Sequence, residues 1–364
     1  MTRLTVLGAV AAIAALSITL AAAASDREAA LDGVEFIQQT QEDDGGFGGF
    51  GPGQTFDAVL AIRSAGVDPN TVTTADNSPA DFLRANVDEV TGDPGSAAKA
   101  ALAADALDLD PADVDGTDFV DTIESFHDAG SGAFAEDAFS QSLAVLGLVC
   151  TGNEVDDSAL GYLAERQLED GGWGFEDAGD PDTTALAVQA LVEGGMDAGD
   201  DAVQSALGFF HEAQHADGGW GAEGDESNAN STALVIQALL TLGEDPDGDD
   251  WAIDGATPWA YITGAQQDDG SFPGFDPAFA TNQAVPALAG RTFCEAPVTE
   301  IETEVEPAPA DDAAAVDDAR PEAPAAGTGQ ATTGGNGSPL FILAAALMVS
   351  GAGMYVATRV RQDG

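Results

Sequence analysis

Positive charge is what this sequence has least of. Its 364 residues include 10 Lys and Arg against 64 Asp and Glu, which gives a formal net charge of −54. Lys99 is the only lysine. Such a surface repels a phosphate backbone, so nucleic-acid binding is excluded. Repulsion between like charges also opposes the compact state unless counter-ions screen it, and we therefore expect saline or calcium-bearing surroundings.

Cysteine is nearly absent as well. Cys150 and Cys294 are too few for a disulfide framework, and neither lies in a CxxC motif or a metal-ligand cluster. Two interpretations stay open, a pair of free thiols or one disulfide formed after export. The repeat units described below place the two cysteines on opposite sides of a six-fold ring, so a disulfide would require the chain to cross that ring.

Long apolar runs occur only at the two ends of the chain. Residues 1–24 combine Arg3 with an apolar run and small residues, which is typical of a secretory leader cleaved after Ala24; an uncleaved anchor is the alternative. Residues 339–358 are apolar and long enough to cross a bilayer. The basic tail that follows, residues 359–364, predicts a cytoplasmic C-terminus.

Residues 295–338 are rich in Glu, Asp, Ala, Pro and Gly and poor in bulky apolar side chains. A segment of this composition forms no core and is typical of an acidic, disordered linker. Together with the two ends, it predicts a single-pass type I membrane protein. Its main domain, residues 26–294, then lies on the extracellular side.

One loop sequence recurs along this domain. QLEDGGWG at 167–174 returns as QHADGGWG at 214–221, and looser copies are QEDDGGFG at 41–48 and QQDDGSF at 266–272. The gap between Gly45 and Gly171 leaves room for two degenerate units, which we assign to residues 78–113 and 116–155. The domain therefore contains six repeat units, each of two helices.

The two helices of a unit differ in polarity. The first, such as residues 158–168, has one apolar stripe, whereas the second, such as residues 183–192 or 231–240, is apolar on nearly all sides. A helix of the second kind is buried all round. Six buried inner helices surrounded by six outer ones predict an all-α fold, an (α/α)6 toroid; an open solenoid is the competing arrangement.

The helix ends and loops carry recognisable signals. We expect inner helices to begin at N-cap residues such as Asp182 and Asn230. Left-handed glycines are expected to end them, at Gly66, Gly194 and Gly243.

The residues that recur in these loops are interpreted as structural. Gly171 and Gly172 allow backbone angles closed to other residues. Trp173 and Trp220 are expected to wedge between units, and Gln167 and Gln214 to bond loop backbone.

The loops and the inner-helix starts DTTALAVQAL and NSTALVIQAL resemble the squalene–hopene cyclase and protein prenyltransferase repeat superfamily across residues 28–294. The stretch FATNQAVPALAGR, residues 279–291, is similar to the last repeat of secreted bacterial members. The resemblance implies a terpenoid cyclase-like toroid with a cavity at the N-terminal ends of the inner helices. The candidate lining residues are Phe56, Asp57, Phe139, Gln141, Asp182, Thr183, Asn230, Ser231, Phe279 and Asn282.

The chemistry that the resemblance implies is only partly present. Cyclases of this group protonate an alkene with an acid in a DxDDTA motif, and here the matching segment is DPDTTA, residues 180–185. Asp180 and Asp182 match the first two acids, and Thr183 replaces the third. The zinc site of the prenyltransferases, made by Asp, Cys and His, has no counterpart, since the three histidines fall in outer helices or loops.

Two further patterns suggest metals. HEAQH at 211–215 fits the zinc motif H-E-x-x-H, but the repeat register assigns it to an outer helix, with no third ligand. DPDGDDWAID at 245–254 resembles the start of a calcium loop, but lacks its central Gly and terminal Glu. We therefore predict no metal and no cofactor.

Two functional hypotheses follow. The first is a non-catalytic binding module for a small apolar molecule or a surface protein. The second is an isoprenoid-processing enzyme that uses Asp180 and Asp182. The missing third acid and the predicted extracellular stalk favour the first.

Overall fold

The structure is a computed structural model that describes residues 27–175, 177–221 and 226–294. The predicted leader, linker, membrane segment and tail lie outside these residues. Within the described ranges the secondary structure consists of helices and isolated β-bridges, with no extended strand. No described helix is both long and apolar enough to cross a membrane.

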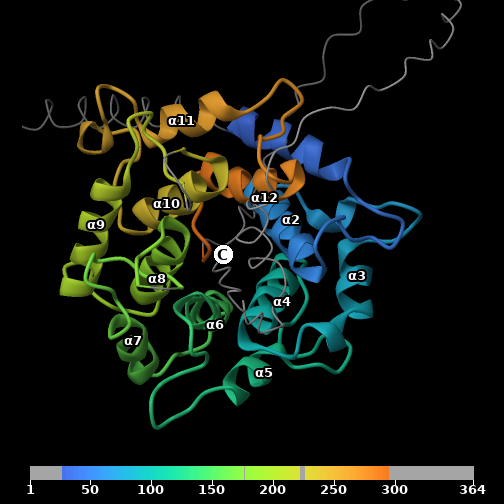
Figure 1. Ribbon diagram of the computed structural model, residues 1–364. Coiled ribbons are helices and arrows are strands. Elements are labelled where there is room, and N and C mark those ends of the chain that lie inside the picture. Colours follow the sequence, from blue (N-terminus) through green and yellow to red (C-terminus); the bar gives the residue numbers. More distant parts are fainter. Residues whose placement is uncertain (1–26, 176, 222–225, 295–364) are drawn as a thin grey trace, which may run out of the picture.

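Six inner helices form a closed ring (Figure 1). Each packs against the next, and the last packs against the first. The closed toroid is therefore confirmed, and the open solenoid is wrong. The inner helices are α2 (Pro52–Ser64), α4 (Pro94–Ala106), α6 (Ala138–Cys150), α8 (Pro181–Glu193), α10 (Ala229–Thr241) and α12 (Pro277–Leu288).

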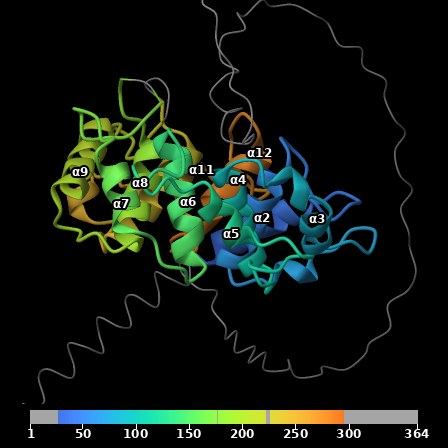
Figure 2. The ribbon, with the colours of Figure 1, turned by 90° about the horizontal axis from the view of Figure 1, so that it is seen from below.

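Outer helices, most of them shorter than the inner ones, surround this ring, and the two layers lie at one level when seen from below (Figure 2). The outer helices are residues 27–38, α3 (Pro79–Ala85), α5 (Phe119–Ser125), α7 (Asp157–Ala164), α9 (Asp201–Ala213) and α11 (Pro258–Ala265). Single 3₁₀ turns lie between units at η1 (Pro69–Thr71) and η3 (Asp249–Trp251), and within the second unit at η2 (Val87–Glu89).

The polarity of the helices explains the two layers. Every residue of α8 from Pro181 to Leu191 is buried, whereas α9 buries one stripe that includes Phe209 and Phe210. Small residues let neighbouring inner helices approach closely. A Cβ on Gly147 of α6 would lie 2.6 Å from the Cβ of Ala98 in α4.

The inner helices begin earlier than the sequence predicted. The N-caps are Asp180 and Asn228, whose side chains accept from the backbone N–H of Thr183 and Ser231, so the prediction of Asp182 and Asn230 is wrong. Pro181 explains the shift at α8, because its fixed φ suits the first helical position. Asp182 therefore does not cap the helix, and its side chain is buried in the first turn.

The predicted C-terminal glycines are correct in two of three helices. Gly66 and Gly243 have φ of 79° and 72°. Gly194 is instead still right-handed, with φ of −72°, and Gly195 takes the left-handed position with φ of 105°.

The repeated loops hold the units together. The side-chain Nε2 of Gln167 donates to the carbonyl of Gly171 in its own loop (2.8 Å) and to that of Ala202 in the next unit (2.7 Å). Gln41 and Gln214 make the same paired contacts. Gln266 bonds its own loop and Ala29, which joins the last unit to the first. The predicted structural role of these glutamines is confirmed.

After α12, residues 289–294, here called the strap, turn into the ring (Figure 1). Cys294 at the end of the strap forms a disulfide with Cys150, the last residue of α6, on the far side of the ring. The interpretation as free thiols is therefore wrong. The crossing that the six-fold geometry requires is made at the end of the ring where the inner helices finish.

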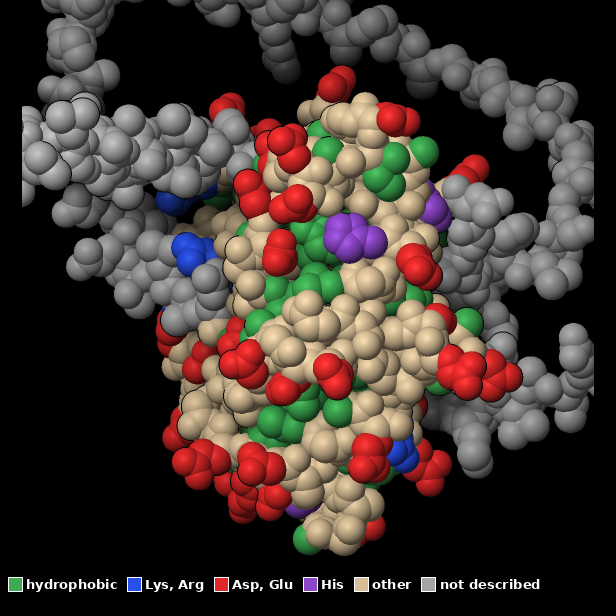
Figure 3. All heavy atoms as spheres, turned by 90° about the vertical axis from the view of Figure 1, so that its left-hand side faces the viewer, with side chains coloured by type: hydrophobic (Ala, Val, Ile, Leu, Met, Phe, Trp, Pro, Cys, Tyr) green, Lys and Arg blue, Asp and Glu red, His purple; other side chains and the backbone are tan. Residues whose placement is uncertain are grey.

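The surface is acidic, as the composition predicts. On the side of the ring shown in Figure 3, Asp and Glu side chains are scattered across the surface and Lys and Arg are few. The acidic residues are therefore spread over this surface rather than gathered in one patch.

Candidate functional site

Asp182 is a buried acid at the end of the ring where the inner helices begin. Its side chain is buried, with 4% exposed. Burial raises the pKa of Asp182 to about 7; the nearby charge of Asp180 also raises it, and a hydrogen bond with Ser231 of α10 partly offsets the rise. Its Oδ1 has no hydrogen-bond partner. Near neutral pH this carboxyl is therefore partly protonated.

The rest of the DPDTTA segment is occupied with local structure. Asp180 accepts from the backbone N–H of Thr183 at 2.8 Å, and burial raises its pKa. The hydroxyl of Thr184 bonds the backbone of Trp173. Thr183, which replaces the third acid of the cyclase motif, is buried and its Oγ1 has no partner. A hydroxyl there supplies no negative charge to act on Asp182.

Aromatic rings surround the same end of the ring. Phe50 stacks on Phe275 with centroids 5.8 Å apart, and Phe139 lies 6.0 Å from Phe175. Phe50, Phe175 and Phe275 are the exposed large hydrophobic residues of the described chain, at 38%, 58% and 62%. We call these four rings the aromatic rim.

Sequence reasoning identified Phe139 and missed the other three rim residues. Each missed ring follows a Gly a few residues before an inner helix, in GGF, WGF and PGF. That recurrence was the available signal.

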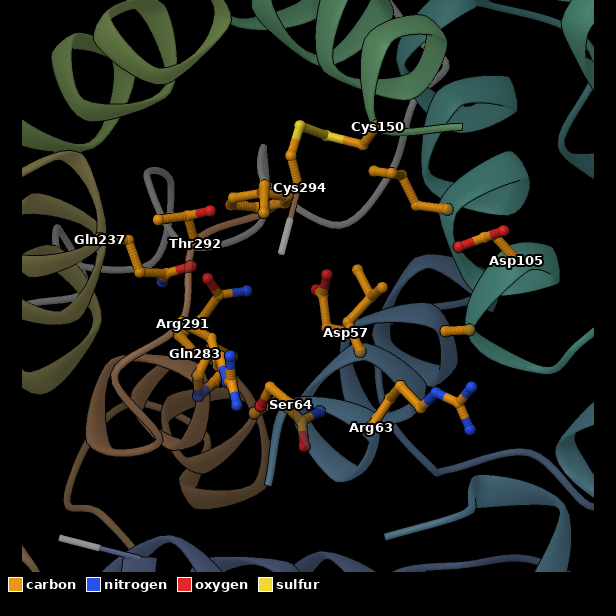
Figure 4. A pocket seen from close by; sticks show the side chains of 16 residues that line it. Asp57, Arg63, Ser64, Asp105, Cys150, Gln237, Gln283, Arg291, Thr292 and Cys294 are labelled. Atoms are coloured by element: carbon orange, nitrogen blue, oxygen red, sulfur yellow. A yellow bond between two sulfur atoms is a disulfide. The ribbon is translucent and has the colours of Figure 1, made fainter. Parts of the chain in front are cut away.

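A cavity lies at the opposite end of the ring, where the inner helices finish (Figure 4). Its volume is about 120 Å³, below the roughly 300–1,000 Å³ of pockets that hold drug-sized ligands. Its walls come from α2, α4, α6, α10, α12 and the strap, and the disulfide is part of the lining. Of the predicted lining residues, Asp57 and Asn282 line this cavity.

A buried ion pair stands at the edge of this cavity. Lys99 of α4 lies 2.6 Å from the carboxylate of Asp57 in α2, and both side chains are largely buried. Burial raises the pKa of Asp57, while the charge and hydrogen bond of Lys99 and a hydrogen bond from Gln283 act in the opposite direction. The only lysine of the chain is thus used inside the ring.

Four other predicted residues do not line this cavity. Gln141 donates to the carbonyls of Gly132 and Ala159 and accepts from the backbone N–H of Phe134. It thereby makes, from an inner helix, the two contacts that a loop Gln makes in other units. Phe56 is 1% exposed and belongs to the core, and Phe279 is also buried. Asn230 is half-buried near the start of α10.

The HEAQH residues are not arranged as a zinc motif. The ring of His211, near the end of α9, stacks on Trp251 with centroids 4.0 Å apart. The helix ends at Ala213, and His215 lies beyond it with its Nδ1 3.0 Å from the hydroxyl of Ser227. The two rings therefore do not share one helical face.

The acidic stretch 245–254 forms a turn. Asp245 accepts from the backbone N–H of Asp247, which in turn accepts from the hydroxyl of Thr257. Across residues 27–175, 177–221 and 226–294, no group of three or more His, Cys, Asp or Glu is placed to hold a metal ion.

Comparison with known families agrees with the ring. The prenyltransferase alpha-alpha toroid domain matches residues 5–91 and 186–278, and the chain belongs to this family. No curated protein matches the chain significantly.

Solved structures share the fold at low sequence identity. A protein from Actinoplanes has a TM-score of 0.55 and 16% identity, covering 73% of this chain and 99% of its own. The type II terpene cyclase MstE from Scytonema has a TM-score of 0.53 and 14% identity, covering 74% and 98%. A variant of MstE in complex with geranylgeranyl dihydroxybenzoate gives 0.52 and 12%, covering 75% and 98%. At these identities the likeness shows the fold alone.

Proposed function

We propose that this terpenoid cyclase-like toroid is a non-catalytic binding module that holds a small molecule at the end of the ring closed by the strap. The observation that carries the proposal is the cavity there, which is lined by charged and amide side chains from several inner helices. A concave site with a few convergent polar groups is the usual form of a ligand site.

The size and lining of the cavity support a polar ligand over an isoprenoid. A volume of about 120 Å³ is small for a long hydrocarbon chain. Phe293 is the only aromatic residue among the lining residues. The sequence predicted an apolar ligand, but Asn282 lines the cavity and its Oδ1 has no hydrogen-bond partner, and a hydrocarbon would leave it so.

Export to the cell surface is part of the same proposal. The apolar runs at 1–24 and 339–358 support a leader and a C-terminal anchor. A disulfide between Cys150 and Cys294 is typical of proteins that fold in an oxidising compartment. The proposed arrangement is an extracellular toroid on an acidic stalk, where it can meet a small solute or a surface protein.

Native mass spectrometry of the full-length protein, purified from its own host, tests the binding module. We expect a retained compound whose mass is that of a small polar molecule and whose retention depends on Asp57. Loss of the compound in Asp57→Asn, with retention in the exposed control Asp88→Asn, supports the site. If the protein carries no compound and captures none from a metabolite extract of its host, the proposal is wrong.

A second candidate function, an isoprenoid-processing enzyme, is favoured by one specific observation at the other end of the ring. Asp182 is a buried acid whose pKa is raised to about 7, close to the value that suits a general acid near neutral pH. The aromatic rim at that end presents π faces of the kind that attract cations.

The second candidate is tested by incubating the protein with squalene and with prenyl diphosphates and analysing products by mass spectrometry. Turnover that disappears in Asp182→Asn and persists in Asp88→Asn would establish the enzyme and refute the non-catalytic module. Absence of product with every substrate, in protein that is folded by circular dichroism, would remove this candidate.

A further inference from the structure

Basic residues gather at the cavity in a chain that otherwise has few. Arg63 and Arg291 line it, and Lys99 pairs with Asp57 in its wall. Half of the described basic residues therefore lie at this one place. The full set of basic residues in the described chain is Arg27, Arg63, Arg84, Lys99, Arg166 and Arg291.

Removing a cation from water is unfavourable unless a negative charge lies next to it. Lys99 meets Asp57 at 2.6 Å, and Arg63 meets Asp108 at 2.9 Å. Arg291 adds a further positive charge from the strap. On a chain with a net charge of −54, this cluster is where the acid group of a small ligand is least repelled.

An acid also faces the same cavity. Asp105 of α4 is one of the lining residues. Burial raises the pKa of Asp105, and the nearby charge of Arg63 acts in the opposite direction. Figure 4 shows Arg291 and Asp105 on opposite sides of the cavity, with Asp57 between them. Arg63 lies on the same side as Asp105, so an acid and a base stand there together, and Arg291 is on the other side.

One polar atom in the lining has no hydrogen-bond partner. Asn282 of α12 is 3% exposed, and its Nδ2 donates to the carbonyl of Gln54 at 3.3 Å. Its Oδ1 has no hydrogen-bond partner, and an amide oxygen left so in the interior is unfavourable. A donor on a bound molecule would satisfy it. The cavity thus combines an unsatisfied acceptor with separated charges of both signs.

We propose that the cavity binds a small zwitterion of the amino-acid type, with its acid group toward Arg291 and its ammonium group toward Asp105. This inference rests on the proposed binding module and adds the class of ligand. A simple anion would face Asp57 and Asp105, and a simple cation would face Arg291, Arg63 and Lys99. A molecule that carries both charges can place its acid group beside Arg291 and its ammonium group beside Asp105.

Calorimetric titration of the full-length protein tests the proposal. The probes are glycine, β-alanine and 4-aminobutanoate, with acetate and methylammonium as the two separate halves. We expect at least one zwitterion to bind tenfold or more tightly than either half. Asp105→Asn and Arg291→Gln should each weaken that binding about tenfold, since a charge-assisted hydrogen bond is lost. The matched controls Asp88→Asn and Arg84→Gln should leave it unchanged.

Each other outcome has a definite meaning. Acetate binding as tightly as the zwitterions would overturn the proposal in favour of a carboxylate site. A sugar or polyol found by native mass spectrometry, with no zwitterion binding, would overturn it while leaving the binding module standing. Zwitterion binding that both cavity variants leave unchanged places the ligand elsewhere and also refutes it.

Discussion

Asp182 should make the stability of the protein depend on pH. Its pKa is 3.8 as a free group and about 7 in the fold, so the folded state holds the proton more tightly. Stability therefore falls as pH rises from about 4 to about 7, by at most about 4 kcal/mol from this group. Asp182→Asn removes the ionisation, so its advantage over wild type should grow across that window. Urea unfolding at several pH values measures this difference.

Other acids with raised pKa values require a control. The pKa values of Asp57, Asp105 and Asp180 are also raised, so Asp182→Asn keeps part of the wild-type slope. Asp88→Asn changes an exposed acid and should leave the slope as it is. Parallel pH profiles for wild type and Asp182→Asn would show that the Asp182 carboxyl ionises as readily in the fold as in water.

Gly171 illustrates how one residue holds two units close. Its φ is 87°, and an added Cβ would lie 2.5 Å from the carbonyl oxygen of Ser205 in α9. Gly171→Ala should cost roughly 2 kcal/mol or more, because both the backbone angle and the contact are unfavourable. Gly208→Ala is the matched control, since Gly208 is in a helix with open space around its Cα. That change should stabilise by about 0.5–1 kcal/mol. Equal midpoints in denaturant unfolding would contradict this account.

At the scale of elements, the loop glutamines are the contacts between neighbouring units. Gln167→Ala leaves the carbonyls of Gly171 and Ala202 without their donor. A loss of about 1–3 kcal/mol is expected for partly buried hydrogen bonds. Gln204 donates once, to the exposed carbonyl of Ala198, so Gln204→Ala should change stability by under about 0.5 kcal/mol. Thermal unfolding of both variants compares them, and equal losses would contradict a special role for the repeated Gln.

The strap and its disulfide should dominate the response to reductant. The bond joins residues 144 positions apart, and a closed loop of that length stabilises by about 5 kcal/mol in the chain-entropy account. We expect a large fall in Tm on reduction, and a similar fall in Cys150→Ser without reductant.

Alkylation gives an independent check of the disulfide. The chain has only two cysteines, so the native protein should take up no iodoacetamide before reduction and two equivalents after it. Uptake by the unreduced, folded protein would contradict the bond.

For the whole molecule, charge is the governing quantity. A net charge of −54 places many carboxylates within one Debye length at low salt, about 10 Å at 0.1 M against 3 Å at 1 M. Raising salt should therefore raise Tm by at least about 2–4 °C, the shift equivalent to 1 kcal/mol in a domain of this size. A melting curve that does not move between 0.1 M and several molar NaCl would contradict the prediction of a saline environment.

The two ends of the ring also differ in what could be predicted from sequence. The repeat register located the region in which each inner helix begins, although the predicted N-caps of α8 and α10 were wrong. It thereby found Asp182 and Phe139 at the end that carries the aromatic rim. It gave no reason to look at Asp105 or Arg291, because these residues lie after the repeated motif and face each other only when α4 and the strap are brought together. The sequence therefore predicted candidate residues better at the end where the inner helices begin than at the end where they finish.

By itself, the sequence determined the architecture. Helix periodicity, the all-round apolar inner helices and the repeated Q-x-x-D-G-G loops are local signals that repeat, and repeated local signals specify a ring. The tertiary structure decided everything that depends on residues distant in the chain. Three features arise from contacts between helices that are separate in the sequence: the disulfide between Cys150 and Cys294, the ion pair of Asp57 with Lys99, and the burial that raises the pKa of Asp182. Desolvation and proximity act through space, and spacing along a chain does not encode them until the ring has closed.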